Sequence, residues 1–156
     1  MAARFSDAAV NDVMASNVVT VHDDATVGEA AALMAGRKCS CLVVVRGSDA
    51  LGIVTERDLV RKVLAIGADP TKVLISDVMS TPLIQIDAGA SVVEAAEKMS
   101  EYLVRRLVVV DRGGALVGLI TASDIARELA KNQAFADSQL NALARLKKGG
   151  TGGPYE

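Results

Sequence analysis

Aromatic residues, histidine and net charge are all scarce in this chain of 156 residues, and each shortage excludes a class of function. The chain has no tryptophan, two phenylalanines and two tyrosines, so few rings are available to stack single-stranded bases. Its formal net charge of −2 lacks the clustered positive charge that binding to duplex nucleic acid requires. We therefore expect no nucleic-acid partner.

Long apolar runs are missing as well. No stretch approaches the roughly 18 uninterrupted apolar residues of a membrane-spanning helix. The first seven residues lack the apolar region of a secretory signal. Cys39 and Cys41 are too few for a disulfide framework, which suits a reducing compartment. We expect a cytoplasmic protein that does not bind a membrane.

Catalytic motifs are also absent. The sequence contains no Gly-x-Ser-x-Gly elbow, no phosphate-binding Walker loop and no His-Glu-x-x-His zinc motif. The single histidine, His22, stands beside Asp23 and Asp24, and a solvated loop explains this position. We interpret the chain as a non-enzyme with no obligatory cofactor and no metal site.

The sequence does contain an internal repeat. Asp12-Val13-Met14 returns 65 residues later as Asp77-Val78-Met79. Gly52-Ile53-Val54-Thr55 returns 66 residues later as Gly118-Leu119-Ile120-Thr121. A long period with two copies, which differ in length by one residue in a turn, indicates two copies of a small α/β unit.

Each copy predicts a strand, a helix, two strands and a helix, so the expected fold class is α+β. The first strands are expected at 18–21 and 83–86. Helices then begin at Thr26 and Ser91, each with glutamate three residues later, which is the spacing of a capping box. The periodicity predicts one buried helical face, formed by Val27, Ala30, Ala31 and Met34 in the first copy.

Two short apolar runs form a predicted hairpin in each copy, at 42–45 with 51–55 and at 107–110 with 116–121. The second helix is expected from residue 56 to 66, and its counterpart from 122 with a continuation towards 148. The expected domains are 8–68 and 73–131, followed by a C-terminal helix at 132–148 and a flexible tail at 149–156.

One motif in each copy offers groups that could bind a ligand. Thr55 and Asp58, and likewise Thr121 and Asp124, stand where a strand runs straight into a helix N-terminus. Open amides there attract anions, and a carboxylate can accept both hydroxyls of a ribose. The same spacing also forms a capping box, which contributes about 1 kcal/mol to stability. Both interpretations stay open, since a capping side chain can also turn to a ligand.

These segments, in this order and twice, resemble the CBS domain, the cystathionine-β-synthase-type regulatory module. The resemblance is carried by Asp-Val-Met, a short strand, a capped alanine-rich helix, a Leu-Val-Val-Val strand and Gly-h-h-Thr-x-x-Asp, where h is apolar. It covers about residues 10–129, and the tandem resembles a CBS pair, or Bateman module. Residues 55–58 and 66–70 are most similar to small stand-alone bacterial CBS-pair proteins, including hypoxia-response types.

The resemblance implies two units packed as a pseudo-twofold pair, with AMP, ADP, ATP or S-adenosylmethionine in one or both interdomain clefts. It also implies a homodimer. We expect the regulated partner to be another protein in trans or a second copy of this chain. The nucleotide-binding residues that it implies are Ser16, Asn17, Val18, Thr81, Pro82 and Leu83 at the base, Thr55, Asp58, Thr121 and Asp124 at ribose and phosphate, and Arg57, Arg105 and Arg106 at phosphate.

The two copies differ around these positions. Asn17 stands where the second copy has Pro82, and Ser40-Cys41 stands where it has Arg105-Arg106. We therefore expect two chemically unequal clefts, of which the arginine-bearing one prefers more phosphate.

Two other functions stay open. Cys39 and Cys41 would point to one side of a strand, and with His22 they would offer three ligands to a redox- or metal-responsive switch. A structural zinc site usually needs four ligands, so buried reduced thiols are the simpler interpretation. The chain could also be a structural interaction protein with empty clefts.

Overall fold

The computed structural model describes residues 8–131 and 143–145, and these residues fall into two compact units. The β1–β3 unit is the continuous segment Val18–Leu83. The β4–β6 unit joins the described residues up to Asn17 to those from Ile84 onwards. The expected helix at 132–148 and tail at 149–156 lie outside the described residues, apart from 143–145, which are helical.

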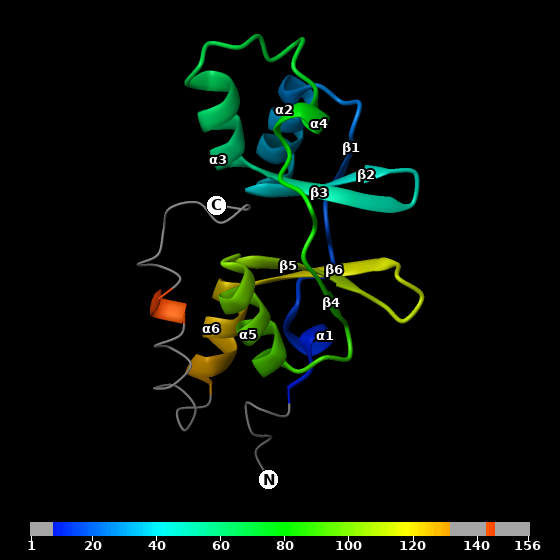
Figure 1. The fold of residues 1–156 in the computed structure, drawn as a ribbon, viewed down its shortest axis with the longest axis vertical. Coiled ribbons are helices and arrows are strands. Elements are labelled where there is room, and N and C mark those ends of the chain that lie inside the picture. The colour runs from blue at the N-terminus through cyan, green and yellow to red at the C-terminus, as the bar shows by residue number, and fades with distance from the viewer. Residues whose placement is uncertain (1–7, 132–142, 146–156) are drawn as a thin grey trace. The chain divides into compact units, whose positions relative to one another are not determined.

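The β1–β3 unit is a three-stranded sheet with its helices on one face (Figure 1). β1 (Thr20–His22) is parallel to β2 (Cys41–Arg46), which is antiparallel to β3 (Asp49–Thr55). A parallel pair needs a crossover connection, which α2 (Val27–Arg37) supplies. The predicted order of strand, helix, strand, strand and helix is confirmed.

The helical segment after β3 is irregular. α3 (Glu56–Leu59) runs directly into a π-helical turn, η2 (Val60–Leu64), in which the Ala65 amide donates to the Val60 carbonyl at 2.8 Å. The segment ends at Leu64, two residues before the predicted end at Ile66. Gly67 follows in a left-handed conformation with φ of 67°, which prevents any continuation of the helix. A short helix, α4 (Ile75–Val78), follows after a loop.

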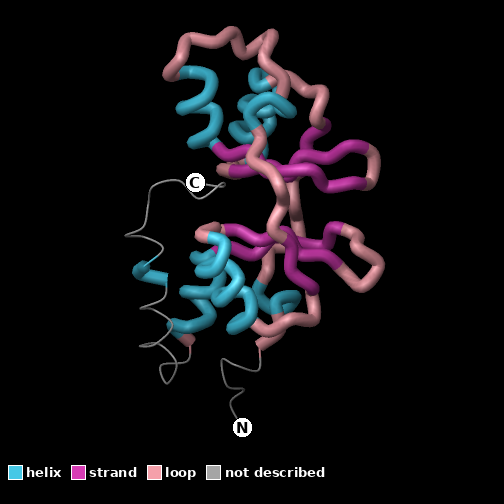
Figure 2. The backbone as a smooth tube through the Cα atoms, viewed as in Figure 1, coloured by secondary structure: helices cyan, strands magenta, loops and turns pink. Residues whose placement is uncertain are grey.

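The β4–β6 unit has the same architecture (Figure 2). β4 (Gln85–Asp87) is parallel to β5 (Arg106–Val110), which is antiparallel to β6 (Leu116–Thr121). α5 (Val92–Tyr102) forms the crossover, and α6 (Ala122–Ala130) follows β6. The fold is therefore mixed α+β in both units, as predicted.

Both first strands begin two residues later than predicted, at Thr20 and Gln85. The parallel ladder explains this start, because its first hydrogen bonds run from the Val43 amide to the Val19 carbonyl and from the Val108 amide to the Ile84 carbonyl, both at 3.1 Å. The chain boundaries of the two units fall just before these strands, between residues 17 and 18 and between residues 83 and 84.

The predicted capping boxes of α2 and α5 are both present. Thr26 Oγ1 accepts from the Glu29 amide at 3.2 Å, and Glu29 Oε2 accepts from the Thr26 amide at 2.9 Å. Ser91 and Glu94 form the same pair of bonds, at 3.0 and 2.7 Å. A local signal of four residues is thus sufficient to place both helix starts.

The predicted buried face of α2 is correct in part. Val27, Ala30 and Met34 are buried, but Ala31 is exposed, whereas its counterpart Ala96 is 4% exposed. The exposed fraction of Ala31 follows from its position on the wall of an apolar groove, described below.

The short helix of each repeat packs on the unit built from the other repeat. α1 (Val10–Val13) belongs to the β4–β6 unit, where the Val10 amide donates to the Ala90 carbonyl at 2.8 Å. α4 belongs to the β1–β3 unit, where the Ile75 amide donates to the Ala25 carbonyl at 2.8 Å. Val10 and Ile75 are both fully buried. The repeat in sequence and the compact unit in space are therefore different segments.

The chain after each short helix pairs with the strand that ends in the Thr-x-x-Asp motif. Ser80 exchanges two backbone hydrogen bonds with Ile53 of β3, at 2.8 and 3.2 Å. A Cβ atom on Gly52 would lie 2.7 Å from the Ser80 carbonyl oxygen, so only glycine leaves room for this close approach. Gly118 is equally confined, with the Ala15 carbonyl oxygen 2.9 Å from the position of a Cβ.

Candidate functional site

The predicted strand-to-helix junction of the β1–β3 unit lies at Thr55, where β3 ends and α3 begins. Thr55 Oγ1 accepts from the Asp58 amide at 3.2 Å. The Asp58 carboxylate reaches back, and its Oδ2 accepts from the Thr55 amide at 2.9 Å and from the Thr55 hydroxyl at 3.1 Å. The capping interpretation of this motif is confirmed.

Burial makes this first junction dependent on internal partners. Thr55 and Asp58 are 3% and 4% exposed, so their polar atoms need hydrogen bonds within the protein. Lys62 supplies the remaining partner, since its Nζ lies 3.1 Å from Asp58 Oδ1. Both carboxylate oxygens of Asp58 therefore have partners in the protein.

The junction of the β4–β6 unit has the same cap in a more open setting. Thr121 Oγ1 accepts from the Asp124 amide at 3.2 Å, and Asp124 Oδ2 accepts from the Thr121 amide at 2.9 Å. Asp124 Oδ1 pairs with Arg127 Nη2. The Asp124 side chain is 12% exposed, compared with 6% for Asp58, so the second carboxylate is the more accessible one.

Two arginines lie beside the junction of the β4–β6 unit. Arg106 is the neighbour of Thr121 in the register of β5 and β6. The Arg105 carbonyl accepts from the amide of Ala122, the first residue of α6, at 2.9 Å. The structure thus places Arg105 and Arg106 on the chain segment beside Thr121. A role of the two arginines in binding phosphate stays a prediction.

The corresponding positions of the β1–β3 unit carry no charge. Cys41 is the neighbour of Thr55 in the register of β2 and β3, and the Ser40 carbonyl accepts from the Glu56 amide at 2.9 Å. Arg57 is exposed on α3, one residue before Asp58. The two junctions therefore share one backbone arrangement and differ in the charge beside it.

The two segments expected at the base lie immediately before β1 and β4. Ser16 and Asn17 are exposed, and Val18, the first residue of the β1–β3 unit, is half-buried. The second segment repeats this pattern with Thr81 and Pro82 exposed and Leu83 half-buried, and the Thr81–Pro82 peptide bond is cis. A role of these residues in binding stays a prediction.

The sequence interpretation missed Lys62 and Arg127 as partners of the two capping carboxylates. A signal was available, because Lys62 follows Asp58 by four residues and Arg127 follows Asp124 by three. Side chains at these spacings meet on one face of a helix.

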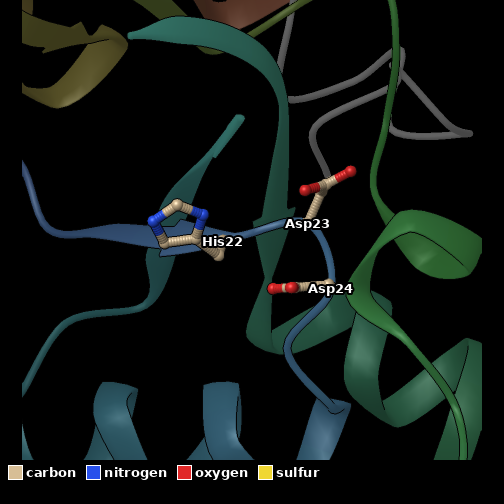
Figure 3. A group of neighbouring side chains, drawn as sticks. All are labelled: His22, Asp23 and Asp24. Atoms are coloured by element: carbon tan, nitrogen blue, oxygen red, sulfur yellow. The ribbon is translucent and has the colours of Figure 1, made fainter. Parts of the chain in front are cut away.

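A group of possible metal ligands lies at the end of β1, as Figure 3 shows. The donor atoms of His22, Asp23 and Asp24 all lie within 4.8 Å of one another. Arg46 competes for this group, since its Nε donates to Asp23 Oδ2 at 2.9 Å. This hydrogen bond, with the positive charge of Arg46, holds the pKa of Asp23 below its usual value and raises the pKa of Arg46.

The cysteines are not part of this group. Cys41 is the first residue of β2, while Cys39 precedes the strand, so the expectation that both thiols point to one side of a strand is wrong. The chain turns between them, after a left-handed residue, Lys38, that ends α2. Both thiols are half-buried, and His22 gathers with Asp23 and Asp24 instead.

An apolar groove of about 230 Å³ lies on the β1–β3 unit, between α2 and the segment of α3 and η2. Its lining consists of Val27, Ala31, Leu59, Val60, Val63, Leu64, Ala68 and Pro70. Val60 and Leu64 are 52% and 75% exposed, although both are large and apolar. Such a surface suits an apolar partner better than a phosphate.

In the described part of the chain, every helix is too short or too polar to cross a bilayer.

The CBS domain family profile matches two segments, residues 10–65 and 75–131, which include both Thr-x-x-Asp junctions. The chain belongs to the CBS-domain family. Paired CBS domains are regulatory modules that bind ligands.

Curated relatives of this CBS pair include proteins of similar and of greater length. An uncharacterized protein of Methanopyrus kandleri is 38% identical over 117 residues, which cover 74% of this chain and 60% of that protein. The CBS domain-containing protein YhcV of Bacillus subtilis is 34% identical over 137 residues, which cover 88% of this chain and 94% of YhcV.

Solved structures of CBS proteins superpose well on this chain. A conserved CBS domain protein from Thermoplasma acidophilum has a TM-score of 0.76 at 26% identity and covers 90% of this chain and 76% of its own. Hypoxic response protein I, solved with two coordinated zinc ions, has a TM-score of 0.67 at 32% identity, with coverages of 77% and 98%. The CBS domain of a bacterial CNNM/CorC family Mg²⁺ transporter, solved with ATP, shares the fold at 20% identity, with a TM-score of 0.73 and coverages of 82% and 91%.

Proposed function

We propose that this CBS pair is a sensor that binds adenosine-containing nucleotides, namely AMP, ADP, ATP or S-adenosylmethionine, at its two strand-to-helix junctions. The observation that carries the proposal is the meeting of Thr121, Asp124, Arg105 and Arg106 at one junction. A carboxylate there can accept ribose hydroxyls, while the helix amides and arginines attract phosphate. The same fold holds ATP in the transporter's CBS domain.

The two junctions should prefer different nucleotides. The junction with Arg105 and Arg106 has two cations for phosphate oxygens and a more exposed carboxylate, so it suits di- and triphosphates. The junction at Asp58 has Ser40 and Cys41 in place of the arginines and suits a ligand with less phosphate, such as AMP.

Calorimetric titration of nucleotide-stripped protein with the four ligands tests the proposal. The expected result is saturable heat with at least one of them, and a gain in stability of about 2.7 kcal/mol at a ligand concentration 100 times Kd. Asp124→Ala should abolish the response to ATP while lowering the stability of the unliganded protein by only about 1 kcal/mol. The opposite outcome is that Asp124→Ala loses stability while the parent protein responds to none of the ligands. The motif would then be a helix cap only, and the chain a structural interaction protein.

The remaining parts of the proposal concern assembly. The sensor passes its occupancy to a regulated protein in trans, acts in the cytoplasm and forms a homodimer. The exposed apolar side chains of Val60, Leu64 and Ile66 support a self-association surface. Sedimentation analysis of the parent and of Leu64→Glu should give a dimer and a monomer, respectively.

A metal-responsive switch is a second candidate function, favoured by the group of His22, Asp23 and Asp24. Hypoxic response protein I carries zinc within the same fold. Equilibrium dialysis against Zn²⁺ should then show one ion per chain that His22→Ala loses. Iodoacetamide labelling of Cys39 and Cys41, with and without Zn²⁺, tests whether the thiols take part. Protection of the thiols by Zn²⁺ would mean that they also bind the metal.

A further inference from the structure

Lys62 bridges the capping carboxylate of the β1–β3 unit and the chain that leaves this unit. Its Nζ lies 3.1 Å from Asp58 Oδ1 and donates to the Val78 carbonyl at 2.8 Å. The Asp58 side chain is 6% exposed and that of Lys62 44%, so water only partly screens the ion pair. One ammonium group thus holds the junction and the end of α4 together.

The end of α4 is the point where the chain turns towards the other unit. Val78 is the last residue of α4, and a cation near a helix C-terminus compensates carbonyls that lack partners within the helix. Two residues later, Ser80 pairs with Ile53 of β3. Leu83 is the last residue of the unit. Lys62 therefore anchors the start of the connecting segment, residues 79–83.

The distribution of hydrogen bonds on Asp58 decides how a ligand can reach this carboxylate. Oδ2 already accepts from the amide and the hydroxyl of Thr55. Oδ1 is the oxygen that Lys62 holds. A carboxylate oxygen has about two acceptor positions, so a ribose diol has to compete with the ammonium group for Oδ1.

We propose that Lys62 is a positioning residue that couples nucleotide occupancy at Asp58 to the connecting segment, an inference that rests on the proposed function. Ribose hydroxyls displace the ammonium group from Asp58 Oδ1, and the anchor at the Val78 carbonyl is weakened with it. The pairing of Ser80 with Ile53 then opens more often. Occupancy of one junction is thereby passed to the chain that leads into the other unit.

The other repeat provides an internal comparison. Glu128 stands at the position equivalent to Lys62 and pairs with Lys131 at 3.4 Å. The cation on Asp124 is Arg127, which belongs to the same helix, α6. Lys62 therefore joins the capping carboxylate to a short helix, whereas Arg127 pairs with Asp124 inside one helix.

Amide hydrogen exchange of Ser80 in the full chain tests the bridge without any ligand, because this amide donates to the Ile53 carbonyl at 2.8 Å. Lys62→Met should speed this exchange about tenfold, the order expected when a hydrogen bond to a charged group is lost. Lys62→Arg should restore much of the protection. Arg127→Met, which removes the cation of the other cap, is the matched control and should leave the Ser80 rate unchanged.

AMP tests the coupling in the Asp124→Ala background, where binding is confined to the β1–β3 junction. Saturating AMP should raise the Ser80 rate of this protein towards that of Lys62→Met, and should add nothing once Lys62→Met is present. Calorimetry should show that Lys62→Met binds AMP at least as tightly, because the competing ammonium group is gone.

Four results would overturn the inference. An unchanged Ser80 rate in unliganded Lys62→Met removes the bridge itself, whatever the ligand does. Binding of AMP with no change at Ser80 removes the coupling and leaves the nucleotide function intact. Affinity for AMP that falls about tenfold in Lys62→Met makes Lys62 a phosphate ligand instead. Absence of heat with all four nucleotides in the parent protein refutes the proposed function, and the coupling with it.

Discussion

Single side chains of the two repeats perform the same task in unlike surroundings. Thr55 and Thr121 both cap a helix with a 3.2 Å bond from an aspartate amide. Thr55 is 3% exposed, while Thr121 is partly exposed and can exchange its bonds for bonds to water. Equal geometry therefore does not mean an equal contribution to stability.

The first prediction compares the two caps. Thr55→Ala should lower the free energy of unfolding by about 2 kcal/mol and Thr121→Ala by about 1 kcal/mol, because a lost buried cap leaves polar atoms that water does not reach. Urea unfolding of each single variant measures both values. Equal losses would mean that burial at Thr55 has no energetic effect.

The second prediction concerns Asp23, whose pKa is lowered mainly by its hydrogen bond with Arg46. A carboxyl group with a lowered pKa in the folded protein stabilises it above the unfolded pKa, about 3.9 for aspartate, and this contribution is lost as the pH falls through the folded value. Arg46→Met should raise the Asp23 pKa, as measured by NMR titration of its carboxyl carbon. The stability difference between parent and variant should shrink on acidification below about pH 4.

Local signals were sufficient at this scale wherever both partners lie within one helical turn. The caps at Thr26, Ser91, Thr55 and Thr121 could be predicted because three-residue spacing fixes the geometry. The contact of Lys62 with the Val78 carbonyl joins distant residues, and no spacing rule reports it.

At the scale of elements, the glycine that opens each Gly-h-h-Thr phrase has a steric role. Gly52 faces the Ser80 carbonyl, which would lie 2.7 Å from a Cβ at this position. The sequence shows that the glycine is repeated, but not why. Glycine is needed because another segment of the chain approaches this position closely. The Gly-h-h-Thr phrase thus provides both the space for the connecting segment, residues 79–83, and the helix cap.

The third prediction follows from this approach. Gly52→Ala should destabilise the protein by about 1–3 kcal/mol, because the added methyl group meets backbone rather than a movable side chain. Gly36→Ala is the control, since it lies in α2 with nothing within 4 Å of the added carbon. Helix propensity predicts a gain of up to about 1 kcal/mol there, and thermal melting compares the two variants.

Element types could be predicted from periodicity, and their details depended on tertiary contacts. The exposed Ala31 satisfied the same spacing as the buried Ala96, but the groove beside α2 leaves it uncovered. The π-helical turn at Val60–Leu64 could not be predicted from the spacing of apolar residues, because backbone hydrogen bonds between residues five apart define it.

At the scale of the whole molecule, the exchange of α1 and α4 defines the two units. Each short helix is encoded at the start of one repeat and packs, through buried Val10 or Ile75, in the unit that contains the strands of the other. The sequence shows that the Asp-Val-Met motif of the two short helices is repeated. Repetition alone does not tell on which unit each short helix packs.

The fourth prediction uses this exchange. Ile75→Ala should speed amide exchange within Val18–Leu83, and Val10→Ala should do so from Ile84 to the end of α6. Removal of buried methyl groups costs about 2–4 kcal/mol for Ile75 and somewhat less for Val10. Hydrogen exchange read by peptide mass spectrometry would locate each effect. Local opening confined to the repeat that carries the substitution would contradict the assignment.

The placement of the short helices has a consequence for each repeat taken alone. A repeat without its neighbour lacks the short helix that packs on its strands, because α1 and α4 each belong to the unit of the other repeat. Its own short helix would meanwhile expose Val10 or Ile75, which are fully buried in the whole chain. Neither repeat can therefore complete its core from its own sequence.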